Sequence, residues 1–454
     1  MFSQYDDDFI RDVSHAKRYL ELWTQIGEFR LLAGADLIRE VRRYGLDLDL
    51  AAMPYLYDEE AAKRAGEGGA PLPLLVERYR RFIGDKLAQR KLMQESWCIP
   101  AHERFRKWRQ RQVNRCWMEF GAKNAAMIHT PVMFELSRGC SVGCPFCGLS
   151  AGKLSGVFAF NAENEALWRD LLRRTRAIVG DAAGTGACYY ATEPFDNPDY
   201  ERFADIYEEE LGRVPQVTTA VAMRQPERTM AFIGSANEKR TVIHRFSVLS
   251  RAALEKVLAY FSPEELCLVE LLPQFSEAPS NGFVPAGRLA VPDGAGGDTI
   301  CCVSGFVVNM VERRVRLMTP CPSSGECPTG ERVLCAAGFA DGDGYSATIE
   351  SMIAEFMRSS PGDGGRLRFC DSLQVSEEDA GLFLSKTERG VQLRLPRFKD
   401  ATSDIFVLVG REMAKGESTR DDIAMKLYTE HGVAPENVYY AIGKLYDGGL
   451  IDER

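Results

Sequence analysis

Short β-rich runs alternate with helical patterns through the middle of this chain, and this alternation limits its fold more than any other feature. Each run is followed by a segment with apolar residues at three- and four-residue spacing. Strands separated by helices favour βα units and a parallel sheet. Five or six such units predict an α/β fold with an open or partial barrel rather than a complete eight-unit barrel. The expected strands are VMFEL (132–136), ACYYAT (187–192), VTTAVAM (217–223), HRFSVL (244–249) and CLVELLPQF (267–275).

Other segments flank this α/β unit. Amphipathic spacing predicts N-terminal helices with a loop at 61–75, and the basic segment 76–127 is either a solvated helix face or a surface for an acidic partner. Two β-rich runs, 299–310 and 313–320, predict a hairpin. The expected units are a helical region (1–95), a basic helical connector (96–127), a barrel (128–320), an extension covering the barrel (321–400) and a small winged-helix-like domain (401–454).

Composition excludes several classes of protein. Hydrophobic residues make up 45% of the 454 residues and charged residues 27%, which is typical of a globular chain without long disorder. The net charge of −9 disfavours general binding to nucleic acid or to an anionic membrane. No apolar run reaches the roughly 18 residues that a membrane helix needs. The acidic N-terminus lacks the apolar core of a secretory signal, so we expect a cytoplasmic protein.

The 13 cysteines carry the clearest chemical signal. A reducing cytoplasm argues against a disulfide framework, and most free cysteines are small buried residues. Cys140, Cys144 and Cys147 differ, because three thiols lie in one short loop directly after the first expected strand. Three thiolates can hold a cluster of four irons and leave one iron open for a substrate or cofactor. A zinc site with a distant fourth ligand is the alternative.

The spacing C-x-x-x-C-x-x-C after the first strand of a βα barrel resembles the signature of radical S-adenosylmethionine enzymes. The resemblance implies a partial (βα)6 TIM-like barrel of the radical SAM type, with a [4Fe–4S] cluster on Cys140, Cys144 and Cys147. It also implies that S-adenosylmethionine binds the open iron and yields a 5′-deoxyadenosyl radical, which abstracts a hydrogen atom. An external electron donor such as flavodoxin or ferredoxin is implied as a partner.

The resemblance also assigns residues around the cofactor. Phe146 stands where the family places an aromatic residue near the adenine. Glu193 stands where the family often has Gly-Gly-Glu facing the cofactor's amino group, although the glycines are absent here. Thr219 is matched to the ribose or the substrate. Arg245 and Ser247 stand where the family supplies polar contacts to the cofactor's carboxylate and ribose.

Longer motifs narrow the resemblance to one group of these enzymes. The motifs FELSRGCSVGCPFCGLSA, YYATEPFDNPDYERF, HRFSVLSRAALEKV, SPEELCLVELLPQ, CVSGFVVNMVERRVRLMTPC and FADGDG follow in this order. Together they resemble the radical enzymes that epimerise residues of ribosomally made peptides, of the kind acting on proteusin precursors. The similarity runs from about residue 10 to about residue 355, and Pro145 replaces the family's usual Trp. It implies L-to-D epimerisation of a precursor peptide.

Both ends of the chain resemble elements of peptide recognition. The segment EFRLL…DLIREVRRYGLDLDLAAM is similar to the helical leader region of nitrile-hydratase-like and nitrogen-fixation-type precursor peptides. This implies a region that recognises or imitates the substrate's leader, and a plain helical cap on the barrel is the alternative. The winged-helix-like tail is similar to the recognition domains of other peptide-modifying enzymes. A DNA-binding fold has the same shape, but residues 418–454 show no basic excess.

Radical inversion of an α-carbon needs a hydrogen donor on the face opposite the abstraction, and a cysteine thiol suits that step. Cys321 is the first candidate, because it ends an expected strand just before a loop, where barrels carry their chemistry. Cys302 is the second, because it and Cys301 are adjacent on a strand and only one can point inward. The other thiols outside the cysteine triplet that we considered are Cys188, Cys267, Cys327, Cys335 and Cys370.

Three alternatives remain open at this point. Cys321, Cys327 and Cys335 are candidate ligands of an auxiliary cluster, which would favour cross-linking or oxidation of a peptide. Another radical modification, such as thioether formation or C-methylation, is possible on the same scaffold, although no segment is large enough for a cobalamin domain. An iron–sulfur sensor that binds DNA would need a tighter fourth cysteine and a basic recognition helix, and neither is evident.

Overall fold

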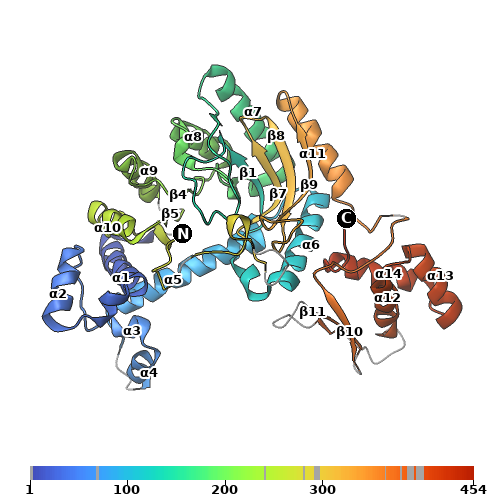
Figure 1. Ribbon diagram of the computed structural model, residues 1–454, viewed down its shortest axis with the longest axis horizontal. Coiled ribbons are helices and arrows are strands. Elements are labelled where there is room, and N and C mark those ends of the chain that lie inside the picture. Colours follow the sequence, from blue (N-terminus) through green and yellow to red (C-terminus); the bar gives the residue numbers. More distant parts are fainter. Residues whose placement is uncertain are drawn as a thin grey trace.

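The computed structural model shows a mixed α/β molecule with a curved central sheet, helices on its outer face and smaller helical units below (Figure 1). No helix in the described part of the chain is long and apolar enough to cross a membrane. The structure describes residues 4–67, 71–239, 242–279, 282–290, 297–362, 364–378, 381–385, 393–394 and 403–453.

The expected alternation of strands and helices is confirmed for most units. Strands β4, β5 and β6 pair in parallel, with helices between them. In chain order the elements are β1 (Thr130–Glu135), α7 (Ala162–Val179), α8 (Tyr200–Leu211), β4 (Thr218–Thr219), α9 (Pro226–Lys239), β5 (His244–Val248), α10 (Arg251–Tyr260) and β6 (Val269–Pro273). A short pair, β2 (Ser137–Arg138) and β3 (Gly156–Val157), flanks the cysteine loop.

A second ladder forms around β1. Strand β7 (Val303–Asn309) pairs in parallel with β1, and β8 (Arg314–Pro320) and β9 (Glu331–Gly338) follow in antiparallel order. The hairpin expected between residues 299 and 320 is therefore confirmed. The strands of the central sheet form two ladders, β1–β7–β8–β9 and β4–β5–β6, rather than one continuous barrel wall.

The strand expected at 187–192 is wrong, although the segment lies where that strand was placed. The Phe134 N–H donates to the Ala187 carbonyl, so the segment runs beside β1. Further along, the Ala191 N–H donates to the Glu135 carboxylate at 2.9 Å instead of to a strand. A side-chain acceptor thus replaces a backbone hydrogen bond between strands. The segment lies between the two ladders but is not a strand.

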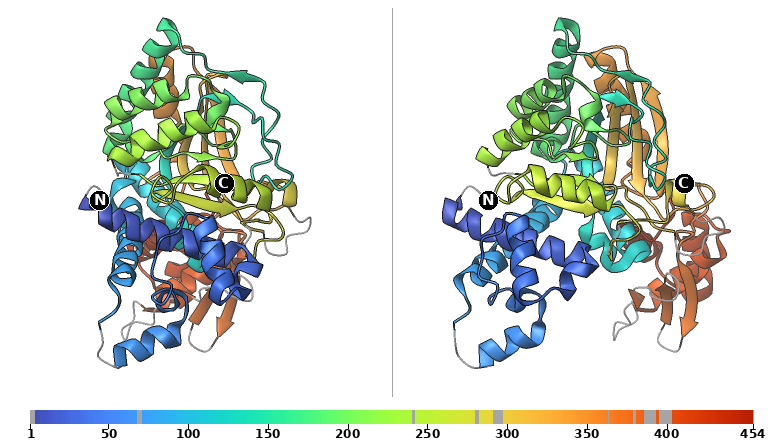
Figure 2. Two further views of the ribbon diagram at one scale, coloured as in Figure 1. Left: turned by 90° about the vertical axis from the view of Figure 1, so that its left-hand side faces the viewer. Right: turned by 60° about the vertical axis from the view of Figure 1, so that its left-hand side comes forward.

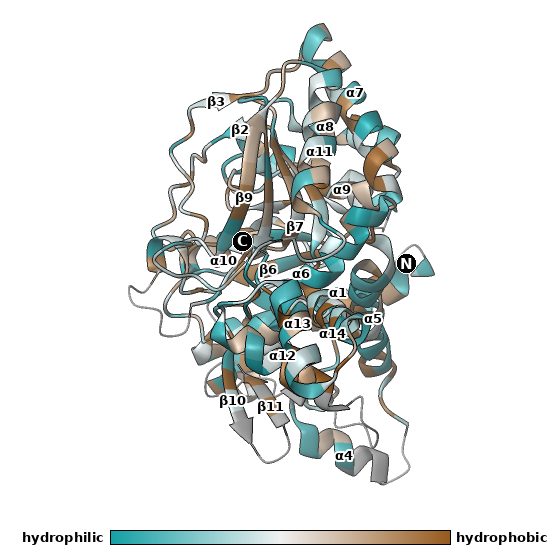
Figure 3. Ribbon diagram, turned by 90° about the vertical axis from the view of Figure 1, so that its right-hand side faces the viewer, coloured by the Kyte–Doolittle hydropathy of each residue, from teal (hydrophilic) through white to brown (hydrophobic). Residues whose placement is uncertain are grey.

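The main core lies between the β1 ladder and the helices that cover it. Apolar side chains of β1, β7 and β8 pack against α7, α8 and α11 (Gly342–Phe356), with Trp168 and Phe203 fully buried among them. The Trp168 indole N–H donates to the Phe203 carbonyl at 3.0 Å, so this buried donor is satisfied. Figure 3 shows hydrophilic and hydrophobic turns mixed along α7, as expected of a helix with one buried face.

The N-terminal region is helical, as expected. Its first helices pack against β5, β6 and α10, whereas α5 runs below the sheet (Figure 2). The loop expected at 61–75 is wrong in its first part, because residues 59–67 continue as a helix rich in Ala and Glu. The helices are α1 (Asp7–Gln25), α2 (Gly34–Arg43), α3 (Pro54–Tyr57), α4 (Glu59–Glu67) and α5 (Leu74–Leu92), followed by a π-helical turn (Met93–Trp97).

Three helices form the C-terminal unit: α12 (Ser403–Lys415), α13 (Arg420–His431) and α14 (Pro435–Asp447). They share one hydrophobic core with residues of the preceding segment, including Leu367 and Leu384. The expected boundary at residue 401 therefore separates helices from strands that pack together. Those strands are β10 (Gln374–Glu378), β11 (Gly381–Ser385) and β12 (Leu393–Arg394), in antiparallel order.

Helix α6 (Glu103–Phe120) contains most of the expected basic connector, and its central arginines are not on a solvated face. They are buried between the sheet and the C-terminal unit, where carbonyls and carboxylates accept their hydrogen bonds. Neither expected role, a solvated face or a surface for an acidic partner, applies to them. The pairs are Arg109 with the His129 carbonyl (2.7 Å), Arg111 with Glu453 (2.6 Å), and Arg115 with Glu119 and the Pro320 carbonyl.

Replacing Arg115 should therefore destabilise the protein strongly. Arg115→Ala leaves the Glu119 carboxylate buried without its cation, and breaking a buried pair in this way costs about 3–5 kcal/mol. Lys107→Ala on the same helix is the matched control, because the Lys107–Glu103 pair is exposed and contributes less than about 1 kcal/mol. Thermal unfolding monitored by circular dichroism measures both. Equal melting temperatures for the two variants would contradict the role of Arg115.

Candidate functional site

The cysteine loop begins where β1 and β2 end, and its first ligand is fixed by backbone contacts. The Cys140 N–H donates to the Gly152 carbonyl at 2.9 Å, which closes the loop on itself. Gly139 precedes it with φ +79°, and a Cβ there would lie 2.2 Å from the Lys153 oxygen. Only glycine allows this approach. The sequence R-G-C thus positions Cys140.

The other end of the loop is held by a segment from beyond β6. The Arg288 N–H donates to the Cys147 carbonyl at 3.0 Å, and its guanidinium donates to the Cys144 carbonyl and to the Ala151 carbonyl. Gly287, at φ +60°, allows this contact, because a Cβ would lie 2.4 Å from the Cys147 oxygen. Both ends of the loop are therefore fixed without using any of the three thiols.

The three thiols are half-buried and near one another. Burial, and then the neighbouring Cys140 and Cys147, raise the pKa of Cys144 to about 11. Within the described residues, no three His, Cys, Asp or Glu side chains close around one point as a single metal ion requires. A four-iron cluster places each thiolate on a different iron, so its ligands need not converge. Half-buried thiols in one loop are a donor set that such a cluster takes.

Glu193 lies beside this loop at the end of the 187–192 segment, in a buried position. Its carboxylate accepts from the Thr219 hydroxyl at 2.6 Å and from the Ala220 N–H at 2.9 Å. Burial raises its pKa to about 7, against the lowering effect of these donors. Its charge also contributes to raising the pKa of Cys140. The structure thus brings Glu193, Thr219 and the first cysteine together, and their contacts to a cofactor remain predictions.

Two further predicted residues lie near the carboxyl ends of the strands. The Phe146 ring packs against Phe283, with 4.7 Å between the ring centroids. Phe146 lies within the cysteine loop, and Phe283 comes from a segment far along the chain. Ser247 lies on β5 opposite Leu272 and is half-buried. Their contacts to a cofactor remain predictions.

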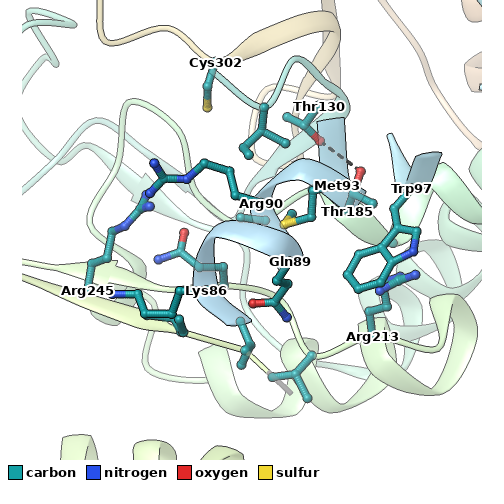
Figure 4. A pocket seen from close by; sticks show the side chains of 18 of the residues that line it. Lys86, Gln89, Arg90, Met93, Trp97, Thr130, Thr185, Arg213, Arg245 and Cys302 are labelled. Atoms are coloured by element: carbon teal, nitrogen blue, oxygen red, sulfur yellow. Dashed lines mark hydrogen bonds between the residues drawn. The ribbon is translucent and has the colours of Figure 1, made fainter. Parts of the chain in front are cut away.

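Arg245 does not lie where the resemblance placed it. Its Nε donates to Glu270 at 3.0 Å, and its side chain lines a cavity at the amino ends of the strands. Cys302 lines the same cavity, which has a volume of about 440 Å³ and contains no residue of the cysteine loop. Figure 4 shows Cys302 and Arg245 on facing walls, with α5 between them. Arg245 comes early in β5, so its position along the strand keeps it away from the carboxyl end.

Cys321 is not in that cavity. Its side chain is 3% exposed, and its pKa is raised by a hydrogen bond with Cys327 and by burial. Its other electrostatic neighbours are Arg115 and Glu119 of α6. The prediction that Cys321 points into the barrel is wrong because β8 runs antiparallel, so its end lies at the amino ends of the parallel strands.

The auxiliary cluster on Cys321, Cys327 and Cys335 is also not supported. Cys321 and Cys327 lie together, but Cys335 lies on β9 and packs against the main core. Burial, and then the charge of Glu355 on α11, raise the pKa of the Cys335 thiol to about 11. These three thiols therefore do not share one site.

Sequence reasoning missed the residues of α5 that close the cavity. Lys86 and Arg90 of α5 line the cavity with Met93 and Trp97 of the π-helical turn that follows (Figure 4). Their spacing of three and four residues is a helical signal. A basic run has this spacing on several faces, so the sequence alone does not show which face meets the sheet.

Comparison with known proteins gives one clear relative. The uncharacterized protein y4wI of Sinorhizobium fredii (strain NBRC 101917 / NGR234) is 34% identical over 471 residues, covering 100% of this chain and 90% of that protein. The chain belongs to the family of y4wI. No protein-family model matches it. A crystal structure of BtrN in complex with AdoMet and 2-DOIA overlaps with a TM-score of 0.34 and 14% identity, covering 50% of this chain and 82% of BtrN.

Glu193 gives this family member a testable pH dependence. An unfolded glutamate titrates near 4.5, whereas burial holds the folded pKa of Glu193 at about 7. Between these values the unfolded chain loses its proton and the folded chain keeps it, so this group lowers stability as pH rises through that window. Above it, Glu193→Gln should be more stable than wild type by up to about 3 kcal/mol.

Denaturant unfolding of the two proteins above and below this window measures the difference. Glu209→Gln on the exposed side of α8 is the control and should show no gain on raising the pH. A Glu193→Gln advantage that stays the same below pH 4.5 would contradict the raised pKa.

Proposed function

We propose that this protein is a radical S-adenosylmethionine enzyme. The observation that carries the proposal is the loop of Cys140, Cys144 and Cys147 after the first parallel strand, with the buried Glu193 carboxylate beside it. When bound, a [4Fe–4S] cluster with S-adenosylmethionine supplies the 5′-deoxyadenosyl radical. The three cysteines would hold the cluster. Glu193 would accept from the cofactor's ammonium group, and Phe146 would pack near its adenine.

Within this class, L-to-D epimerisation of a ribosomally made precursor peptide agrees best with the sequence motifs. The step that this chain's own residues must supply is the return of a hydrogen atom to the α-carbon. Of the two candidates, Cys302 lines a cavity whereas Cys321 is packed against α6, so hydrogen return by Cys302 requires the peptide to reach from the cysteine loop into that cavity. The Cys302 S–H bond breaks and a C–H bond forms. The resulting sulfur radical then takes one electron from an external donor such as flavodoxin or ferredoxin, and one proton from water.

The state of the Cys302 thiol suits this role. Burial raises its pKa, against the lowering effect of Arg245, so the sulfur keeps its hydrogen at neutral pH. A thiolate has no hydrogen atom to donate. The N-terminal helices and the C-terminal unit both lie below the sheet, on opposite sides of the molecule (Figure 1), and are the candidate binding surfaces for the peptide's leader.

Loss of a cluster ligand tests the cofactor. Anaerobic reconstitution with iron and sulfide should load the wild type, and Cys140→Ala should lose most of the bound iron and the visible absorbance of a [4Fe–4S] cluster. Cys188→Ala is the matched control, because that thiol is buried among core residues and should leave the iron content unchanged. Equal iron content in both variants would contradict the assignment of the loop.

The reaction itself is tested by mass spectrometry in heavy water. The reconstituted enzyme, with S-adenosylmethionine, reductant and a precursor peptide encoded nearby, should form 5′-deoxyadenosine and add about one dalton per changed residue. The added mass arises because a solvent-exchangeable thiol returns deuterium. Cys302→Ala should keep cleavage of the cofactor but lose the mass gain, whereas Cys321→Ala should keep both. A loss of about two daltons would instead show cross-linking or oxidation.

A further inference from the structure

The cavity at the amino ends of the strands has an unusual charge pattern. It lies between α5 and the starts of β1, β5 and β7, on the side away from the cysteine loop. Four cations line it, Lys86, Arg90, Arg213 and Arg245, together with the carboxylates Glu208 and Glu270. Figure 4 shows the Arg90 and Arg245 guanidinium groups extending toward one another. An anion between them would relieve the repulsion of these like charges.

Internal pairing accounts for only part of this charge. Lys86 lies 2.7 Å from one oxygen of Glu270, and the Arg245 Nε lies 3.0 Å from the other. These cations outweigh burial and lower the pKa of Glu270 to about 2, so the carboxylate stays charged. Arg90 makes no ion pair with any described residue. Its charge and the terminal nitrogens of Arg245 are therefore available to a ligand.

We propose that this cavity binds a carboxylate group, held jointly by the Arg90 and Arg245 guanidinium groups. Guanidinium groups bind carboxylates through two parallel N–H donors, which matches the fork of each arginine. Glu270 remains charged on the same wall and disfavours a dianion such as phosphate more than a monoanion. The bound carboxylate would lie in the cavity that Cys302 also lines.

The rest of the lining indicates what carries the carboxylate. Met93, Met133 and the Trp97 ring give the cavity apolar walls, and the Arg213 guanidinium covers that ring at 4.2 Å. An apolar body next to the charged group fits these walls. The ligand is therefore a carboxylate on an apolar molecule, either a small free acid or an acidic residue beside an apolar one in a peptide.

Calorimetric titration tests the site on the full chain, without cofactor or reductant. The probes are N-acetylleucine, the capped peptide acetyl-Leu-Glu-amide, its acetyl-Leu-Gln-amide analogue and inorganic phosphate. We expect binding of at least one carboxylate probe, and none of the Gln analogue. Arg90→Gln should weaken that binding about tenfold or more, since the loss of hydrogen bonds to a charged group changes affinity by about this factor.

Lys91→Gln is the matched control, because it removes the same charge from the exposed neighbour on α5. Arg90→Lys separates geometry from charge and should restore only part of the affinity. Preference between the free acid and the capped peptide identifies the source of the carboxylate, and either result supports the site. Absence of binding by both carboxylates, equal weakening in Lys91→Gln, or tighter and Arg90-dependent binding of phosphate would overturn the proposal. None of these outcomes depends on radical chemistry, so failure of the proposed function would be recognised separately.

Discussion

Buried guanidinium groups on α6 hold the separate parts of this molecule in one arrangement. Arg109 is bound to carbonyls just before β1, Arg115 to the end of β8, and Arg111 to the carboxylate of Glu453 near the C-terminus. Removing charged groups from water is expensive, and these buried acceptors offset much of that cost, although Nη1 of Arg111 has no partner among the described residues. One helix therefore fixes the start of the sheet, the end of its antiparallel strand and the C-terminal unit relative to one another.

This arrangement gives the sheet two chemically different ends. At the carboxyl ends, Cys140 and Glu193 meet in a loop region whose backbone is fixed through Gly139 and Gly287. At the amino ends, α5 closes a cavity with cations and the Cys302 thiol. A reaction that removes a hydrogen atom on one face and returns one on the other needs groups from two sides.

Local spacing made part of this predictable from the sequence. The three cysteines lie in one loop whatever the tertiary fold, whereas Glu193 was expected only from the resemblance to radical S-adenosylmethionine enzymes. The prediction for Cys321 is wrong because catalytic residues gather at the carboxyl ends of parallel strands, whereas β8 is antiparallel. The predictions for Arg245 and for the arginines of α6 are wrong for another reason. The sequence shows that a residue is basic, but burial and partners depend on contacts far along the chain, such as Arg245 with Glu270 and Arg111 with Glu453.

The two proposals meet at the Cys302 thiol. A hydrogen donor must stay protonated, and Arg245 alone would favour the thiolate. Burial works against this effect, and a carboxylate bound to Arg245 would cancel much of the remaining positive charge near the sulfur. Binding of an anionic ligand would then favour the S–H form in which hydrogen return is possible. Burial already keeps the thiol protonated at neutral pH without a ligand, so a bound carboxylate would reinforce the state of the donor rather than switch it.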